Sequence, residues 1–189
     1  MYVTDLAPYY YPVFGGQQLL MVGWLERDHA FPTGEVPAEL VAKLRAIERS
    51  PYPRQYSCAL TRGLHYCHFC KGGDREASNA ELFIPDADIP KRYYATTFLT
   101  SHYIESHRYQ PPEAFIRAVL AVDLSRPYDA IVVYDSLLLS PETMRRRYEE
   151  SAKAADNRRI DPESTEKQRE YFLRGSHLRY RKWLDEDQL

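Results

Sequence analysis

The stretch Leu64–Gly73, LHYCHFCKGG, holds two of the three cysteines and two of the six histidines of the chain. Cys67 and Cys70 form a CxxC pair. A zinc ion takes four ligands in a tetrahedron, and two thiolates at this spacing in a tight turn supply two of them. The glycine pair that follows lets the backbone close the turn without a Cβ clash. The stretch therefore predicts half of a zinc site, in a knuckle over residues 62–73.

His102 and His107 are the expected second half of this site. They follow Cys70 after 31 intervening residues, and the spacing between them is typical of zinc ligands. Residues five apart on an ideal helix point about 140° away from each other. However, His107 lies just before the pair Pro111-Pro112, so we expect a loosened last turn that brings its imidazole back toward His102. The predicted site is thus Cys67, Cys70, His102 and His107, with the histidines on a helix over residues 96–108.

Other interpretations of the cysteines stay open at this point. A redox CxxC should lie where a strand feeds a helix, whereas this pair is followed at once by glycines. The cysteines and histidines could also be buried without a metal. His65 or His68 could replace one of the helix histidines as a ligand, since both lie close to the knuckle. Cys58, the odd thiol, is expected to pack as a small apolar side chain.

The expected zinc is structural. A catalytic zinc normally keeps three protein ligands and an open position, and four good ligands leave none. Glu105 lies between the two histidines, but helical geometry points it elsewhere. The H-x-E and P-C-x-x-C pattern of zinc deaminases is absent. The site therefore favours a protein that is not an enzyme.

Hydrophobic periodicity predicts a mixed α+β domain. Residues 17–26 have the character of a strand, and apolar residues at helical spacing follow Pro37 and end before Ser50. Residues 80–85 and 91–97 predict a hairpin, and a second helix is expected to start at the Pro111-Pro112 pair. Knuckle, hairpin and ligand helix in this order predict a treble-clef-like unit.

Two domains are expected, a core over residues 1–139 and a charged helical extension over 140–189. The core should close with a buried strand in YDAIVVYDSLLL, residues 128–139. Ser140-Pro141 then opens a helix with a narrow apolar stripe, and another helix is expected from Asp161-Pro162 to Gly175. From Pro141 onward there are 12 Lys/Arg and 11 Asp/Glu, so the extension is charged but nearly balanced.

The overall composition gives no attraction to nucleic acid or to an anionic membrane. The formal net charge is −2 and the pI is about 6.3. No apolar run reaches the roughly 18 residues of a membrane span, and the first residues lack the features of a secretory signal. We expect a cytoplasmic protein, where reduced thiols remain available to a metal.

Three separate blocks of the sequence resemble a group of bacterial proteins known as a domain of unknown function. The blocks are VGWLERDHAFPTGEVPAEL, RGLHYCHFCKGG and HYIESHRYQPPEAFIRAVL, and the resemblance covers roughly Tyr2 to Val122. It implies a zinc-binding fold within Arg62–Val122, in which the four expected ligands match the motif positions. It implies no activity.

Three classes of function remain in competition. The closed metal site, the near-neutral charge and the 16 tyrosines favour a protein-interaction module, such as an adaptor or an immunity or defence component. The stretches MRRRY and HLRYRKW favour nucleic-acid binding, although the spacer between the ligand pairs is much longer than in DNA-reading fingers. A metal-dependent hydrolase or nuclease is the third class, with His29 and Glu35 as polar candidates in the loop DHAFPTGE.

Overall fold

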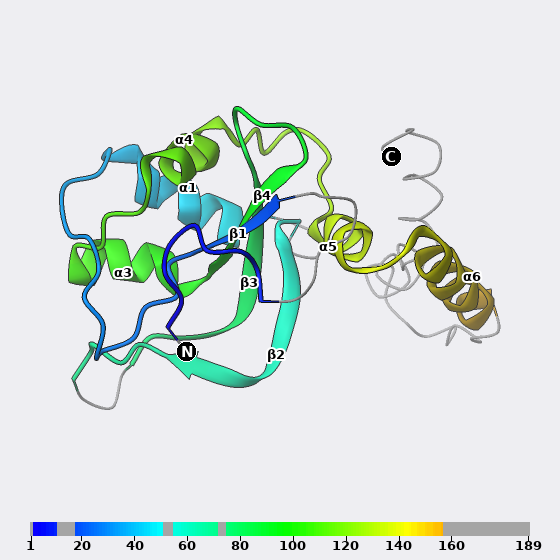
Figure 1. Ribbon diagram of the computed structural model, residues 1–189, viewed down its shortest axis with the longest axis horizontal. Coiled ribbons are helices and arrows are strands. Elements are labelled where there is room, and N and C mark those ends of the chain that lie inside the picture. Colours follow the sequence, from blue (N-terminus) through cyan, green and yellow to red (C-terminus); the bar gives the residue numbers. More distant parts are fainter. Residues whose placement is uncertain (1, 11–17, 51–54, 72–74, 157–189) are drawn as a thin grey trace, which may run out of the picture. The chain divides into compact units, whose positions relative to one another are not determined.

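The computed structural model describes residues 2–10, 18–50, 55–71 and 75–156, and it contains a four-stranded sheet (Figure 1). The strand order is β1-β4-β3-β2. Adjacent strands are antiparallel except β1 and β4, which run parallel. The strands are β1 Gln18–Val22, β2 Ser57–Tyr66, β3 Ala77–Pro85 and β4 Arg92–Thr97.

Helices cover one face of this sheet, so the expected α+β class is confirmed (Figure 1). Among the described residues before α5, the helices are α1 Glu39–Glu48, α3 Leu99–His107 and α4 Glu113–Ala121. Their buried side chains form one hydrophobic core with β3 and β4. Examples are Leu44 of α1, Tyr103 of α3, Phe115 of α4, Ile84 of β3 and Tyr94 of β4. This core fixes α3, the helix that carries the two histidines, against the sheet.

The expected hairpin is present as β3 and β4, and its turn is held by a side chain. Asp86 Oδ1 accepts hydrogen bonds from the backbone N–H groups of Asp88 and Ile89, at 2.7 and 2.9 Å. At the far end of β4 the hydroxyl of Thr97 accepts a hydrogen bond from the N–H of Leu99, at 3.3 Å. The chain therefore passes directly from β4 into α3.

Strand β2 is a part of the sheet that the sequence did not predict. It pairs with β3 through Ser57↔Leu82 and Tyr66↔Ala77, with register shifts between these ends. Its C-terminal end lies directly before the CxxC pair. Up to Lys71, the last described residue before the gap, the expected knuckle over residues 62–73 is thus the end of a long strand and the start of a loop.

The prediction of a strand over residues 128–139 is wrong, because this stretch forms helix α5, Ala130–Leu138. Short apolar runs give no period that separates a buried strand from a buried helix. The helix has a cap: Asp129 Oδ1 accepts the N–H of Ile131 at 3.0 Å. Ala130 and Leu137 are both fully buried. They are seven residues apart, which is about two turns, and so lie on one face of the helix.

The chain divides into two compact units, residues 1–131 and 132–189. Helix α6, Pro141–Asp156, begins where the sequence predicted, and the Ser140 hydroxyl accepts the N–H of Thr143 at 3.2 Å. The helix expected from Asp161 lies outside the described residues, and the division after residue 139 stays a prediction. Among the helices of the described ranges, none has both the length and the apolar character needed to cross a membrane.

Candidate metal centre

The cysteine pair lies in the loop that leaves β2. This strand ends at Tyr66, and the backbone N–H of Cys67 donates a hydrogen bond to the carbonyl of Glu76, at 2.8 Å. That bond ties the start of the loop to the segment that leads into β3. Cys67 is fully buried and Cys70 is partly buried. The glycines expected to close the turn, Gly72 and Gly73, lie outside the described residues.

Both histidines come from α3, and the end of this helix is widened. Arg108, the residue after His107, has a left-handed backbone with φ 56° and ψ 26°. Its N–H donates to the carbonyl of Tyr103, five residues back, and the N–H of Tyr109 donates to the same oxygen at 3.1 Å. A regular α-helix bonds four residues back, so the last turn is looser than ideal. The turn that follows His107 is thus loosened, and Nε2 of His107 lies 3.2 Å from Nε2 of His102.

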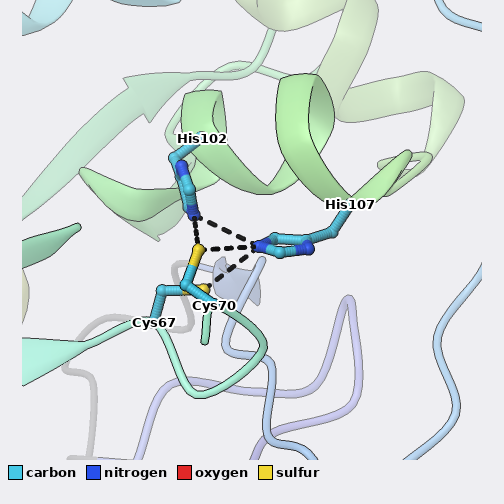
Figure 2. Close-up of side chains that lie close together, drawn as sticks. All are labelled: Cys67, Cys70, His102 and His107. Atoms are coloured by element: carbon cyan, nitrogen blue, oxygen red, sulfur yellow. Dashed lines mark hydrogen bonds between the residues drawn. The ribbon is translucent and has the colours of Figure 1, made fainter. Parts of the chain in front are cut away.

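The four side chains converge on one small volume (Figure 2). Cys67 Sγ lies 3.2 Å from His107 Nε2, and Cys70 Sγ lies 3.3 Å from His102 Nε2. Cys70 Sγ and His107 Nε2 are 3.5 Å apart, and the two Nε2 atoms are 3.2 Å apart. All four ligand atoms lie within 4.8 Å of one another. The structure thus brings together the four residues that the sequence singled out.

These distances fit a tetrahedral metal ion. Zinc bonds of about 2.3 Å to sulfur and about 2.0–2.1 Å to nitrogen hold their donor atoms roughly 3.3–3.8 Å apart. Four of the six donor pairs lie 3.2–3.5 Å apart, close to this range, and all six lie within 4.8 Å. Two imidazole Nε2 atoms at 3.2 Å repel each other unless a proton or a cation lies between them. The cluster can therefore hold a metal ion without any rearrangement of the backbone.

The surroundings of the cluster shift the pKa values of its histidines toward the metal-binding form, and that of Cys70 away from it. Burial lowers the pKa of both His102 and His107, which favours the neutral imidazole that a metal requires. Burial raises the pKa of the Cys70 thiol, and the neighbouring Cys67 raises it further. Two adjacent thiolates repel each other, so a bound cation is the natural means of stabilising both.

Two contacts that the sequence did not predict orient the imidazoles. The Ser106 hydroxyl lies 3.3 Å from Nδ1 of His102, the nitrogen that faces away from the cluster. The ring of Phe69, between the two cysteines, packs against His107 and Tyr103, with ring centroids 5.3 and 5.9 Å apart. Hydrogen bonding to the second ring nitrogen and packing of this kind fix the direction of metal-binding histidines. No signal in the sequence indicated the role of Phe69, and only the fold shows that it contacts His107 and Tyr103.

The alternative ligands lie outside the cluster. His68 contacts the Glu26 carboxylate through Nδ1, and the ring of His65 packs near Trp24, with centroids 6.2 Å apart. Neither belongs to the Cys/His group. Glu105 points away, as expected from helical geometry, and its carboxylate forms an ion pair with Arg45.

The remaining candidates of the sequence do not assemble a second site in the described part of the chain. His29 and Glu35 are both exposed, and His29 stacks on Tyr2 with ring centroids 3.9 Å apart. Of the basic stretch MRRRY, Arg145 and Arg146 are exposed on α6. The side chain of Cys58 and the whole stretch HLRYRKW lie outside what the structure describes.

A family model described as Domain of unknown function (DUF7919) matches residues 1–120 of the chain. The match contains the sheet, α1, α3 and all four members of the Cys/His cluster. Nothing among the curated proteins or the solved structures matches the chain.

Proposed function

The chain belongs to the DUF7919 family, whose description names no activity, and we propose that it is a structural-zinc protein that acts as a protein-interaction module. The observation that supports this proposal is the convergence of Cys67, Cys70, His102 and His107. Two thiolates and two imidazoles are a ligand set that zinc favours. With four protein ligands, a tetrahedral zinc has no position left for a substrate.

The proposed zinc joins two parts of the chain that are separate in sequence. Its thiolates come from the loop after β2 and its imidazoles from the end of α3. The loop between Tyr66 and Ala77 contains no regular secondary structure among its described residues. Four bonds to one ion would hold this loop on α3, in a treble-clef-like unit. Structural zinc contributes folding free energy directly in sites of this kind.

Two exposed side chains beside this unit support the proposal of a partner surface. Leu64 and Tyr66 on β2 are 54% and 44% exposed, immediately before the first cysteine. Exposed aromatic and aliphatic side chains of this kind supply the apolar centre of protein interfaces. The formal net charge of −2 adds no general attraction to phosphate backbones. We therefore place the partner on β2 beside the zinc knuckle, with the chain performing no chemistry of its own.

Co-purification with quantitative mass spectrometry tests this function. The wild-type chain should retain one protein partner at near-equal amount, and Leu64→Ser or Tyr66→Ser should release it. Ile89→Ser is the matched control, since Ile89 is also 44% exposed but lies in the turn after β3. Nuclease treatment should leave the partner bound.

The competing functions predict different results in the same preparation. If the chain binds nucleic acid, a labelled duplex or single strand will shift in a gel at low salt and be released steeply as salt rises. A shift of that kind, or loss of the partner on nuclease treatment, would contradict the interaction module. Equal partner loss in Leu64→Ser and Ile89→Ser would remove β2 from the proposal.

A further inference from the structure

A cavity of about 280 Å³ lies in the first unit, apart from the Cys/His cluster. It shares no lining residue with that cluster. Its walls come from the segment after β1, from the end of β2, from β3 and from the end of β4. The lining residues are Trp24, Leu64, His65, Ser78, Asn79, Ala80, Glu81 and Thr97.

The carboxylate in this wall lies on the face of the sheet opposite the helices. Successive residues of a strand point to opposite faces. Leu82 and Ile84 of β3 belong to the core that the helices cover, so Glu81 and Phe83 face the other way. Glu81 is paired across the ladder with Thr97 of β4, which also lines the cavity. The carboxylate of Glu81 therefore lies outside the helix-covered core.

Glu81 is an unusual residue for such a place. It is only 2% exposed, and its two oxygens accept hydrogen bonds from the hydroxyls of Tyr9 and Tyr10, at 2.8 and 3.1 Å. Burial raises the pKa of this carboxyl, and the two tyrosine hydroxyls oppose the rise. Buried carboxyl groups are rare because taking a charge out of water is costly. This one is held in position by two tyrosines, at the edge of a cavity.

The rest of the lining adds aromatic and polar groups around the carboxyl. The rings of Trp24 and His65 meet edge to face, with centroids 6.2 Å apart. Trp24 is 8% exposed, and within the described residues its indole N–H has no hydrogen-bond partner. Asn79 and Thr97 supply an amide and a hydroxyl. A carboxylate beside aromatic rings is the combination that recognises organic cations, through an ion pair and through the negative face of the ring.

We propose that this cavity binds a small organic amine in its protonated form. The ammonium donates to the Glu81 carboxylate, and the apolar body of the ligand lies against Trp24 and Leu64. The volume of about 280 Å³ admits a molecule of up to about ten non-hydrogen atoms but not a drug-sized ligand. Asn79 and Thr97 also line the cavity. The proposal does not depend on the zinc, because no metal ligand takes part.

Tryptophan fluorescence tests the proposal in the full chain with benzylamine as the probe. The chain has two tryptophans, so Trp183→Phe leaves Trp24 as the reporter. Benzylamine should change the emission with saturation at pH 7.5, where it is charged. Benzyl alcohol, which has the same shape without the charge, should bind at least about tenfold more weakly, since a charge-assisted hydrogen bond is worth at least this factor. Absence of saturation, or equal binding of the two probes, would overturn the proposal.

Glu81→Gln, in the same Trp183→Phe background, supplies the second arm. The amide keeps the shape of the side chain and removes the charge, so the affinity for benzylamine should fall at least about tenfold. Glu35→Gln is the control, because Glu35 is exposed and does not line the cavity. Unchanged affinity in Glu81→Gln would contradict the assignment of the carboxylate. If Glu81→Gln does not fold, the comparison of the two probes on the parent chain decides.

Discussion

His102 and His107 are five residues apart on one helix, yet their Nε2 atoms lie 3.2 Å from each other. An ideal helix would direct them about 140° apart. The helix departs from ideal geometry at its end. There the Arg108 N–H donates to the carbonyl of Tyr103, five residues back, and the Arg108 backbone is left-handed. The two imidazoles therefore meet at the end of the helix, directly before the left-handed Arg108.

Substitution of Arg108 tests whether this helix end supports the position of His107. Arg108→Val should cost about 1–2 kcal/mol of unfolding free energy, because a β-branched residue is strained at φ 56°. It should also weaken metal binding, since relief of the strain moves His107, whereas Arg108→Gly should preserve both. Thermal melts and competition with a chelating dye measure the two effects. Lys91→Val is the matched control, because Lys91 has φ 60° in the turn before β4 and should lose stability alone.

One zinc per chain is the expected stoichiometry. Elemental analysis of reduced protein purified without chelator should give a value near one, since four suitable donors converge in the described part of the chain. Cys67→Ser and His107→Ala should each reduce it sharply. His68→Ala should leave it unchanged, because His68 contacts Glu26 instead of the cluster. A value near zero in the wild-type chain would remove the zinc site.

Loss of a metal ligand should damage the fold. Structural zinc contributes on the order of 10 kcal/mol to small domains, which is comparable with the whole stability of a domain. Cys70→Ser or His102→Ala should therefore lower Tm by at least about 10 °C or give insoluble protein. Chelator should do the same to the wild type, and His65→Ala should melt close to wild type. Soluble ligand variants with nearly unchanged Tm would instead favour a catalytic metal.

The convergence of the four Cys/His side chains was predictable from the sequence because its signals are chemical and local. Cys67 and Cys70 form a CxxC pair, and the proline pair after His107 indicates that the ligand helix ends before it. What the sequence did not show is which other side chains pack against one another across the fold. Nothing in the spacing indicated that Phe69 would pack on His107, or that Glu81 would line a cavity with Trp24.

The wrong strand over residues 128–139 has a definite cause. The run of Val and Ile in this stretch favours a strand by propensity, and its length does not separate the two structures. The decisive signal was Asp129, which caps α5 through the N–H of Ile131. An Asp directly before an apolar run is a helix-start signal. Strand β2 was not predicted for a different reason. Its pairing with β3 shifts register between Leu60 and His65, and this shift interrupts the alternation of apolar and polar residues that indicates a strand.

Gly23 should not tolerate a side chain. Its φ is 75°, and a Cβ there would lie 2.5 Å from the hydroxyl of Thr100, which is itself held by Thr96 at 2.7 Å. Gly23→Ala should therefore cost about 2–4 kcal/mol of unfolding free energy, measured by denaturant titration. Gly34→Ala is the control, because its Cβ would meet only the end of the Gln110 side chain. Equal losses in the two variants would contradict this account.

Glu48, the last residue of α1, should make stability depend on pH near neutrality. Burial raises the pKa of its carboxyl to about 7, although the Ser101 hydroxyl and the guanidinium groups of Arg45 and Arg49 oppose the rise. Within the described residues, its Oε1 has no hydrogen-bond partner. The ordinary pKa is 4.5, so between pH 4.5 and about 7 the folded state binds more protons than the unfolded state. Stability from this group therefore falls as pH rises through that window.

Glu48→Gln should remove this dependence, because the amide carries no charge at any pH. At pH 8.5 the variant should be about 1–3 kcal/mol more stable than the wild type, and at pH 5.5 the difference should shrink strongly. Metal ligands also take up protons in acid, so the quantity to compare is the difference between variant and wild type at each pH, taken from denaturant titrations of metal-loaded protein. Glu35→Gln, at an exposed position, should show no such trend. A difference that is the same at both pH values would mean that the Glu48 carboxyl does not titrate in this window.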